Sequence, residues 1–322
     1  MRIAILAVLA LAAATAARAD DDCRLKQIGD YALKKGAGGD YLFPIEIAGQ
    51  QRWFEVGLHN PFSAIRGEFA DAQKFPSKDL PQGMTAQING REVTQQVTVG
   101  EFHVGPARGA NFNMFRVDSL LSNDPGVTGV AGMDLLANFD VELDLKNSRM
   151  RLFSQDHCRG EAVYWADRYA AVPFEKDRSG HFTFSMRLDG ERVHVDFAVD
   201  TGAAEMDMNV AKRIFGLDET KPGMQAMHDG DGTSYRYPFK TLGLDGVQIL
   251  NPAIFLVRRS GPECKPYHPS AEYQAKTCYG TADLTLRDAE LRQMRLYFAF
   301  KEKTLYATPA DATLPKAAPK TP

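Results

Sequence analysis

The sequence predicts a mostly β protein made of two tandem lobes that are related by an approximate twofold axis. Two observations support this fold class: the chain repeats itself, and apolar residues alternate as in strands, with no long helical pattern. Residues 48–65, AGQQRWFEVGLHNPFSAI, align without gaps with residues 189–206, DGERVHVDFAVDTGAAEM. Each copy is typical of a hairpin turn followed by an alternating strand.

A second match lies near the end of each copy. Residues 139–153, FDVELDLKNSRMRLF, align with residues 294–308, MRLYFAFKEKTLYAT. Both segments predict a two-stranded hairpin that follows a short helical stretch, LLANF in one copy and AELRQ in the other. Tandem copies of this kind suggest two lobes packed face to face. We therefore expect an N-terminal lobe at 20–158 and a C-terminal lobe at 159–308, both of ordinary domain size.

The N-terminus, MRIAILAVLALAAATAARA, has the pattern of a secretory signal peptide: a basic start, an apolar run and small residues before the expected cleavage site. We expect residues 1–19 to be removed and the mature protein to be periplasmic or secreted. A retained signal anchor is the alternative. No later stretch reaches about 18 apolar residues, so no membrane span is expected in the mature chain. The tail at 309–322, PADATLPKAAPKTP, is expected to be disordered.

Charge and motifs exclude several function classes. Without Arg2 and Arg18, the 38 Lys and Arg residues fall to 36, against 41 Asp and Glu residues. This weakly acidic balance and the absence of a basic stripe argue against nucleic acid or an anionic membrane as a partner. The histidines show no metal-ligand spacing, and no phosphate-binding or dinucleotide-binding motif is present. We expect no metal and no cofactor.

The four cysteines are Cys23, Cys158, Cys264 and Cys278, and none lies in a C-x-x-C pair. In an exported protein, an even number of cysteines favours disulfides. Of the three possible connectivities we favour Cys23–Cys158 with Cys264–Cys278, because each bridge then lies within one half of the chain. Free buried thiols are the alternative.

Three segments of the second half resemble the retropepsin-like aspartic proteases, most closely bacterial exported members. They are FAVDTGA at 197–203, HDGDGTSYR at 228–236 and LGLDGVQILNPAIFLV at 242–257. The segment GVTGVAGMDLLANFDVELDLKNSRMRLF in the first half is also similar to the end of that fold. D-T-G alone is a weak motif. Here it lies at a strand end with the rest of the fold in order, and the resemblance covers about residues 40–308.

The resemblance implies two pepsin-like or retropepsin-like β-barrel lobes and a site built around Asp200. In this family two carboxylates share one proton and activate a water molecule for attack on a peptide carbonyl. Thr201 would bond across to the partner loop, Gly202 would allow the tight turn, and Ala203 would complete the loop. The flap candidate is a hairpin formed by His228, Asp229, Gly230, Asp231 and Gly232. A plain hairpin turn is the alternative, and a calcium loop is disfavoured because no twelve-residue loop ending in Glu follows.

The first half departs from the family pattern at the aligned positions. His59 aligns with Asp200, Asn60 with Thr201 and Pro61 with Gly202. One carboxylate is therefore missing, and Pro61 lacks an N–H group. His59 is either a loop histidine that remains after the first site decayed or a replacement partner for Asp200. An imidazole with a pKa near 6.5 can hold the water or stabilise the intermediate.

Three functions remain open from the sequence. The first is an exported aspartic endopeptidase acting on a peptide or protein substrate, in which Asp200 pairs with His59 or with Asp200 of a second chain in a homodimer. The second is a catalytically inactive pseudoprotease that acts as a periplasmic peptide-binding, protein-binding or scaffold protein. The third is a structural envelope protein. The D-T-G-A loop favours the first over the third, whereas the H-N-P-F loop favours the second.

Disulfide mapping tests the cysteine assignment. Mass mapping of the exported protein under non-reducing conditions should find two intrachain bridges, Cys23–Cys158 and Cys264–Cys278. Free thiols on the mature protein would contradict the assignment.

Overall fold

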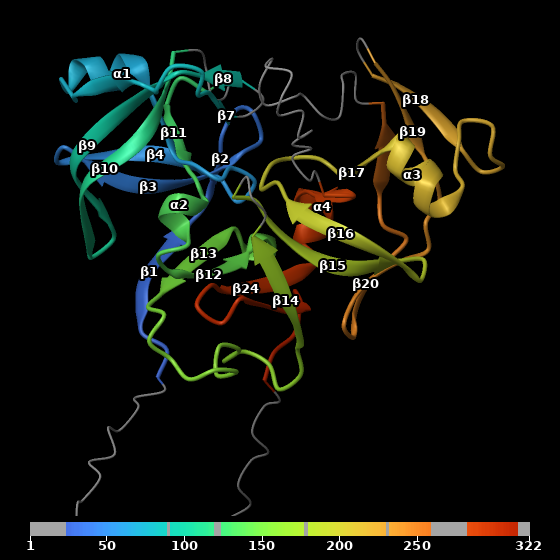
Figure 1. Ribbon diagram of the computed structural model, residues 1–322. Helices are drawn as coiled ribbons and strands as arrows, with labels where there is room; N and C mark the ends of the chain where they lie inside the picture. Colours follow the sequence, from blue (N-terminus) through green and yellow to red (C-terminus); the bar gives the residue numbers. More distant parts are fainter. Residues whose placement is uncertain are drawn as a thin grey trace, which may run out of the picture.

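The computed structural model describes residues 24–88, 91–118, 124–176, 180–229, 232–258 and 282–314. Strands dominate these residues, so the expectation of a mostly β fold is confirmed (Figure 1). The helical elements are short: α1 (Gly67–Ala72), α2 (Met133–Leu136), α3 (Met208–Phe215), α4 (Asp288–Leu291) and the 3₁₀ turn η1 (Leu145–Asn147). None of these helices is long and apolar enough to cross a bilayer.

Six strands of the first half close into a barrel. In order around the barrel they are β3 (Tyr41–Ile47), β4 (Gln50–Val56), β11 (Val127–Ala131), β5 (Ala64–Arg66), β10 (Ala107–Val117) and β9 (Gln95–Val104). Pairing of Ile47 with Phe102 returns the sheet to β3 and leaves these strands without an open edge. The remaining strands of this half are β2 (Lys34–Lys35), β6 (Ser77–Asp79) and the hairpin of β7 (Ala86–Ile88) and β8 (Arg91–Val93).

The second half repeats this pairing order. Its strands are β15 (Phe182–Leu188), β16 (Glu191–Phe197), β23 (Leu284–Leu286), β17 (Ala204–Asp207), β22 (Ile254–Val257), β19 (Gly232–Arg236), β18 (Gln225–Asp229), β20 (Thr241–Leu244) and β21 (Val247–Leu250). β16 pairs with β23 in parallel, as β4 does with β11. β23 is antiparallel to β17, as β11 is to β5, and β17 is parallel to β22, as β5 is to β10.

The strand ends follow the gapless sequence alignment. β4 and β16 begin at the aligned residues Gln50 and Glu191, and each follows a two-residue turn with positive φ angles. Such turns, formed here by Ala48-Gly49 and Asp189-Gly190, match the twist of a hairpin. β3 and β15 also fall in step, so the repeat reaches further towards the N-terminus than the sequence match showed. The rotation that relates the two halves, and their lobe boundaries, stay predictions.

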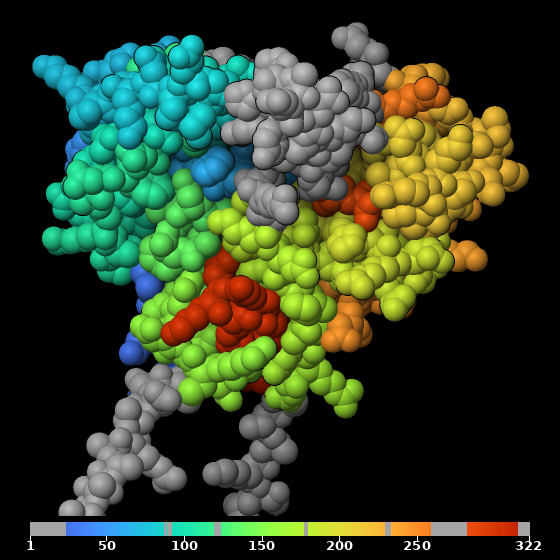
Figure 2. All heavy atoms as spheres, in the orientation of Figure 1, coloured from blue at the N-terminus to red at the C-terminus, as the bar shows by residue number. Residues whose placement is uncertain are grey.

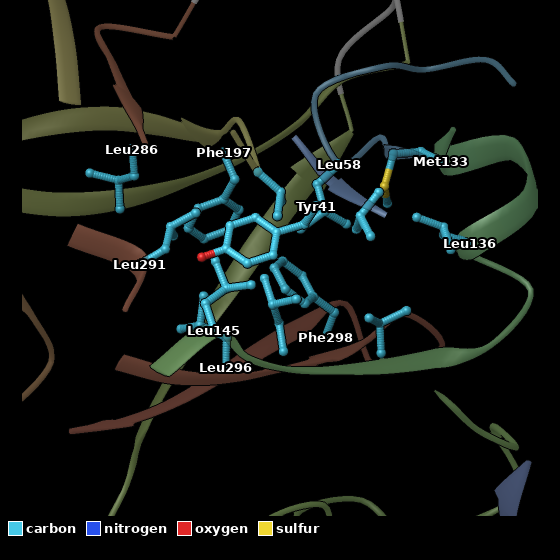
Figure 3. Close-up of a cluster of buried hydrophobic side chains, with 14 of the residues drawn as sticks. Tyr41, Leu58, Met133, Leu136, Leu145, Phe197, Leu286, Leu291, Leu296 and Phe298 are labelled. Atoms are coloured by element: carbon cyan, nitrogen blue, oxygen red, sulfur yellow. The ribbon is translucent and has the colours of Figure 1, made fainter. Parts of the chain in front are cut away.

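A path of six neighbouring strands joins the two halves. It runs β1 (Gln27–Ala32), β13 (Arg149–Phe153), β12 (Asp140–Asp144), β24 (Met294–Ala299), β25 (Thr304–Pro309) and β14 (Ala170–Lys176). The halves meet where β12 pairs antiparallel with β24, around Glu142 and Tyr297. The main core cluster contains residues of both halves, and Figure 3 shows Tyr41 lying among Phe197, Leu145 and Phe298. The two halves therefore share one hydrophobic core.

The start of the C-terminal tail contacts the rest of the protein. β25 extends to Pro309, the Ala310 N–H donates to the Gln293 carbonyl at 2.9 Å, and Ala312 packs against the cluster around Trp165. Residues 309–312 thus have a backbone partner and apolar surface to cover, and the disorder expected for the tail at 309–322 stays a prediction. Residues 1–23, Cys264, Cys278 and residues 315–322 lie outside the described residues. Cys158 is disulfide-bonded, but its pairing stays a prediction because the other three cysteines are outside that part.

A buried polar cluster lies under the junction of β12 and β24. The fully buried Asp140 accepts hydrogen bonds from His157 Nε2 at 2.5 Å, the Phe300 N–H at 3.0 Å and the Tyr297 hydroxyl at 3.3 Å. Burial lowers the pKa of His157, but its hydrogen bonds to Asp140 and to the Cys158 carbonyl outweigh burial, and the net shift is upward. The segment that connects the two halves is thus anchored to their shared sheet.

Removing the Asp140 carboxylate should destabilise the whole protein. Asp140→Ala leaves three buried donors without an acceptor, and we expect a loss of about 3–5 kcal/mol in the free energy of unfolding, measured by urea denaturation. The raised pKa of His157 makes its contribution largest below about pH 6.5 and lost as the pH rises through the folded-state value. The exposed Asp245→Asn should have little effect, because Asn tolerates the positive φ of this turn residue. Equal losses in both variants would contradict this role.

Candidate functional site

A cavity of about 570 Å³ lies between the two halves. Figure 2 shows the first half in blue and green and the second half in yellow and orange, on either side of the upper face. The charged and imidazole side chains that line the cavity are Asp40, Glu55, His59, His181, Asp200, Glu205 and Arg287. The structure thus brings the two main site residues predicted from the sequence, Asp200 and His59, into one cavity.

The repeat explains how these side chains are arranged. Three aligned pairs lie in or beside the cavity, and they are Asp40 with His181, Glu55 with Asp196, and His59 with Asp200. In the first and third pairs one half supplies a carboxylate where the other supplies an imidazole. The cavity is therefore built from equivalent positions with different chemistry on its two sides.

The loop that carries Asp200 is held by the start of α4. The Asp288 N–H donates to the Asp200 carbonyl at 3.1 Å, and the Ala289 N–H donates to the Gly202 carbonyl at 3.0 Å. The first amides of a helix have no partner within the helix, so the loop carbonyls satisfy them. In the first half the Met133 N–H donates to the Asn60 carbonyl at 2.8 Å in the same way. Both aligned loops are therefore fixed by a short helix.

Carboxylates on these helices hold the residue that follows each loop. Asp134, which the sequence places in the first turn of a helix, lies in α2 and accepts from the Ser63 N–H at 2.8 Å and the Ser63 hydroxyl at 2.6 Å. Glu290 on α4 accepts from the Ala204 N–H, next to Ala203, at 2.8 Å. Burial raises the pKa of Glu290 to about 7. These acids hold the site loops in place through hydrogen bonds to the residue that follows each loop.

Arg287 binds the Asp200 carboxylate directly. Its Nη1 lies 2.5 Å from Asp200 Oδ2, and its Nη2 lies 3.2 Å from Glu205 Oε1. Burial raises the pKa of Asp200, and the Arg287 guanidinium offsets part of that rise. The sequence analysis did not single out this arginine. Arg287 aligns with Gly132 only when the match of 139–153 with 294–308 is extended towards the N-terminus.

Packing explains why the two halves differ at this position. A Cβ atom on Gly132 would lie 2.3 Å from the Phe62 backbone, so the first half requires glycine there. In the second half the glycine is in the loop instead: Gly202 has a φ of 147°, and a Cβ on it would lie 3.1 Å from Arg287 Cδ. In the first half the glycine stands before the helix, and in the second half it stands in the loop. Only the second half therefore has room for a long side chain before its helix.

His59 forms an ion pair across the two halves. Its Nδ1 lies 3.1 Å from Oδ2 of Asp196, which is 7% exposed, and its ring centroid is 5.6 Å from that of His181. Burial raises the pKa of Asp196, but the hydrogen bond from His59 and its charge outweigh burial and hold the pKa below its usual value. Asp200 and His59 thus have different ion-pair partners. Their joint catalytic role stays a prediction.

Thr201 contacts a different segment from the one expected. Its hydroxyl donates to the Gly39 carbonyl at 2.9 Å rather than to the aligned loop of the first half. The turn before β3 reaches across the interface and supplies the acceptor. Lys35, on β2, holds this turn by an ion pair with Asp288 at 2.9 Å.

Asp40 is a site residue that sequence reasoning missed. It lies between Gly39, which accepts the Thr201 bond, and Tyr41, whose N–H donates to the Val199 carbonyl at 3.4 Å. Burial raises the pKa of Asp40, and the charge of Asp200 raises it further. The repeat could have indicated it, because the alignment of 48–65 with 189–206, extended by one strand towards the N-terminus, matches Asp40 with His181.

The flap candidate is a hairpin, but the described residues give it no contact with the cavity. β18 and β19 pair antiparallel, with His228 opposite Thr233, while Gly230 and Asp231 lie outside the described residues. Gln225 and Arg236, at the base of the hairpin, line a separate cavity of about 260 Å³. A flap role for this hairpin stays a prediction. Among the described residues no cluster of three metal ligands occurs.

The chain matches no protein-family model and no curated protein sequence. Among solved structures it is similar to the basic 7S globulin from soybean, with a TM-score of 0.50 and 11% identity over 89% of this chain and 99% of that one. It also resembles conglutin gamma, a basic 7S globulin from lupine seeds, with a TM-score of 0.47 and 9% identity over 88% and 95%. The soybean likeness shows a shared fold of the aspartic-protease-like type. At this identity it shows nothing about activity.

The His59–Asp196 pair can be tested through stability. His59→Ala leaves the buried Asp196 carboxylate without this donor, and we expect a loss of about 1–3 kcal/mol near pH 6, measured by urea denaturation. The pKa of Asp196 is depressed, so this contribution is present above the unfolded value of about 3.9 and lost as the pH falls through the folded value. The control is His194→Ala, at an exposed position on β16, the strand that carries Asp196. A loss that persists unchanged at strongly acid pH would contradict the pairing.

Proposed function

We propose that this protein binds a peptide or protein segment in the cleft between its lobes and does not hydrolyse it by the aspartic mechanism. The observation that supports this proposal is the ion pair between Arg287 and Asp200. Of the two main hypotheses drawn from the sequence, the geometry favours the pseudoprotease over the endopeptidase. An exported, periplasmic location remains part of the proposal.

The aspartic mechanism needs a carboxylate that can take a proton from water. The Arg287 guanidinium is a cation that only donates hydrogen bonds, and its Nη1 already contacts Asp200 Oδ2. The aligned position in the first half holds His59, which pairs with Asp196. The two aligned loops therefore present one carboxylate, held at one oxygen by Arg287, and an imidazole in place of the second carboxylate.

The cavity suits a bound segment. Ligand sites commonly measure about 300–1,000 Å³ and combine apolar walls with a few polar groups. The cavity of about 570 Å³ draws Val56 and Pro61 from one half and Ala198 and Val199 from the other, beside the charged groups. A peptide held there would contact both lobes.

One observation favours the endopeptidase as a second candidate. Asp40 supplies a carboxylate from the first half beside Asp200, and two close carboxyl groups can share one proton. In this alternative the Asp40 carboxylate would replace the one that is missing at position 59. A homodimer that joins two Asp200 residues stays a prediction from the sequence.

A cleavage assay separates these functions. Wild type, Asp200→Asn and Arg287→Gly are incubated with a peptide library between about pH 3 and 8, the range in which carboxyl and imidazole groups titrate, and products are read by mass spectrometry. We expect no cleavage by wild type or Asp200→Asn. Cleavage by wild type that is lost in Asp200→Asn would overturn the proposal and support the endopeptidase. Cleavage by Arg287→Gly alone would show that the arginine blocks the site.

Binding is measured separately with peptides selected from the same library on immobilised wild type. Ala198→Trp fills the cavity and should abolish their capture, because Ala198 lines it. Leu250→Trp, at a site 65% exposed, is the matched control and should bind as wild type does. Equal capture by both variants would place binding outside the cleft.

A further inference from the structure

Two contacts place Asp40 directly opposite Asp200. The Thr201 hydroxyl donates to the Gly39 carbonyl at 2.9 Å, and the Tyr41 N–H donates to the Val199 carbonyl at 3.4 Å. The two segments run in opposite directions, so the residues between these contacts face each other. A Cβ on Gly39 would lie 2.4 Å from Thr201 Oγ1, which shows how closely the segments touch.

The residues that face each other here are both acids, and both line the cavity. Like charges placed directly opposite destabilise a strand pair, and two carboxyl groups that share a site hold one proton more tightly. Asp200 Oδ1 is buried and has no hydrogen-bond partner among the described residues, whereas Oδ2 is bound by Arg287. A proton between the two carboxyl groups would relieve the repulsion and satisfy this oxygen.

Other charged groups surround the pair on every element packed against it. They are Glu55 on β4, His59 in the loop after β4, His181 before β15, Glu205 on β17, Arg287 and Asp288 at the start of α4, Lys35 on β2, and Asp124, which binds the Ala37 N–H. Arg287 is already paired with Asp200 and Glu205, and Lys35 with Asp288. Among the described residues these cations therefore have closer partners than Asp40.

We propose that Asp40 and Asp200 form a proton-controlled joint between the two lobes. A proton shared between the two carboxyl groups tightens the contacts of Thr201 with Gly39 and of Tyr41 with Val199. Loss of that proton loosens them and frees the mouth of the cleft. This inference rests on the facing segments and holds whether or not the cleft binds a peptide.

The direction of the pH effect follows from the two acids. Burial and the neighbouring carboxylate raise the pKa of Asp40, and burial raises that of Asp200, so the joined state binds the proton more tightly than the separated state. The joint therefore strengthens as the pH falls into the range just above the ordinary carboxyl value of about 4. The His59–Asp196 pair is lost only at lower pH, because the pKa of Asp196 is depressed.

Hydrogen exchange at the Tyr41 amide measures the joint. We expect its protection factor, corrected for intrinsic exchange, to be about two- to fivefold higher near pH 5 than near pH 7.5 in the full-length mature protein. Asp40→Asn removes the repulsion, so protection should be high at both pH values. Asp40→Glu keeps the charge and should keep the dependence on pH. Asp245→Asn removes one exposed charge elsewhere and should behave as wild type.

Two results would overturn the joint. One is a Tyr41 amide in Asp40→Asn that keeps the wild-type dependence on pH. The other is protection that falls below wild type near pH 7.5 in both Asp40→Asn and Asp40→Ser, which would show that the Asp40 charge stabilises the contact. Amides of β4 serve as a reference within the barrel. The cleavage assay is read independently, so failure of the joint and failure of the proposed function are distinguishable.

Discussion

The antiparallel pairing of β12 with β24 is the constraint on which the rest of the structure depends. It joins β1, β13 and β12 of the first half to the sheet of the second half, while the barrel strands of the first half form a separate sheet. The loops at 59–61 and 200–202 are thereby held relative to each other. Its centre is polar and buried: Glu142 on β12 accepts from Arg151, Arg295 and the Tyr164 hydroxyl. An acid removed from water needs such partners, and here they come from both halves and from the segment that joins them. The cavity above is therefore built on a rigid base.

Above this base a contact between small residues decides the chemistry. Each half must bring a loop and the start of a short helix together, and one side of that contact must be small. The first half uses Gly132 beside its proline-containing loop, and the second uses Gly202 and so admits Arg287. A choice made for packing thus determines whether a guanidinium can reach the carboxylate. The contact between Gly202 and Arg287 thus links backbone packing to the charge beside Asp200.

Much of the fold follows from short-range patterns. Alternating apolar residues and the turns at 48–49 and 189–190 predict β4 and β16, because alternation and turn chemistry are local. The motif also places Asp200 in a cavity. Arg287 and Asp40 are different, since each meets Asp200 only through tertiary contacts set by the shared sheet. Thr201 found an acceptor in a turn whose path local patterns do not encode. Ala312 packs against the cluster around Trp165, a contact that composition alone does not reveal.

The alignment of Asp40 with His181 and of His59 with Asp200 has one more consequence. A cleft formed by two identical subunits must carry the same side chain at equivalent places, so an acid on one wall requires the same acid on the other. Covalent fusion of the halves removes that requirement. Each wall can then change by a single substitution without a matching change opposite. This chain has acids at positions 40 and 200 and imidazoles at the aligned positions 181 and 59. A symmetric pair of identical subunits cannot have this combination.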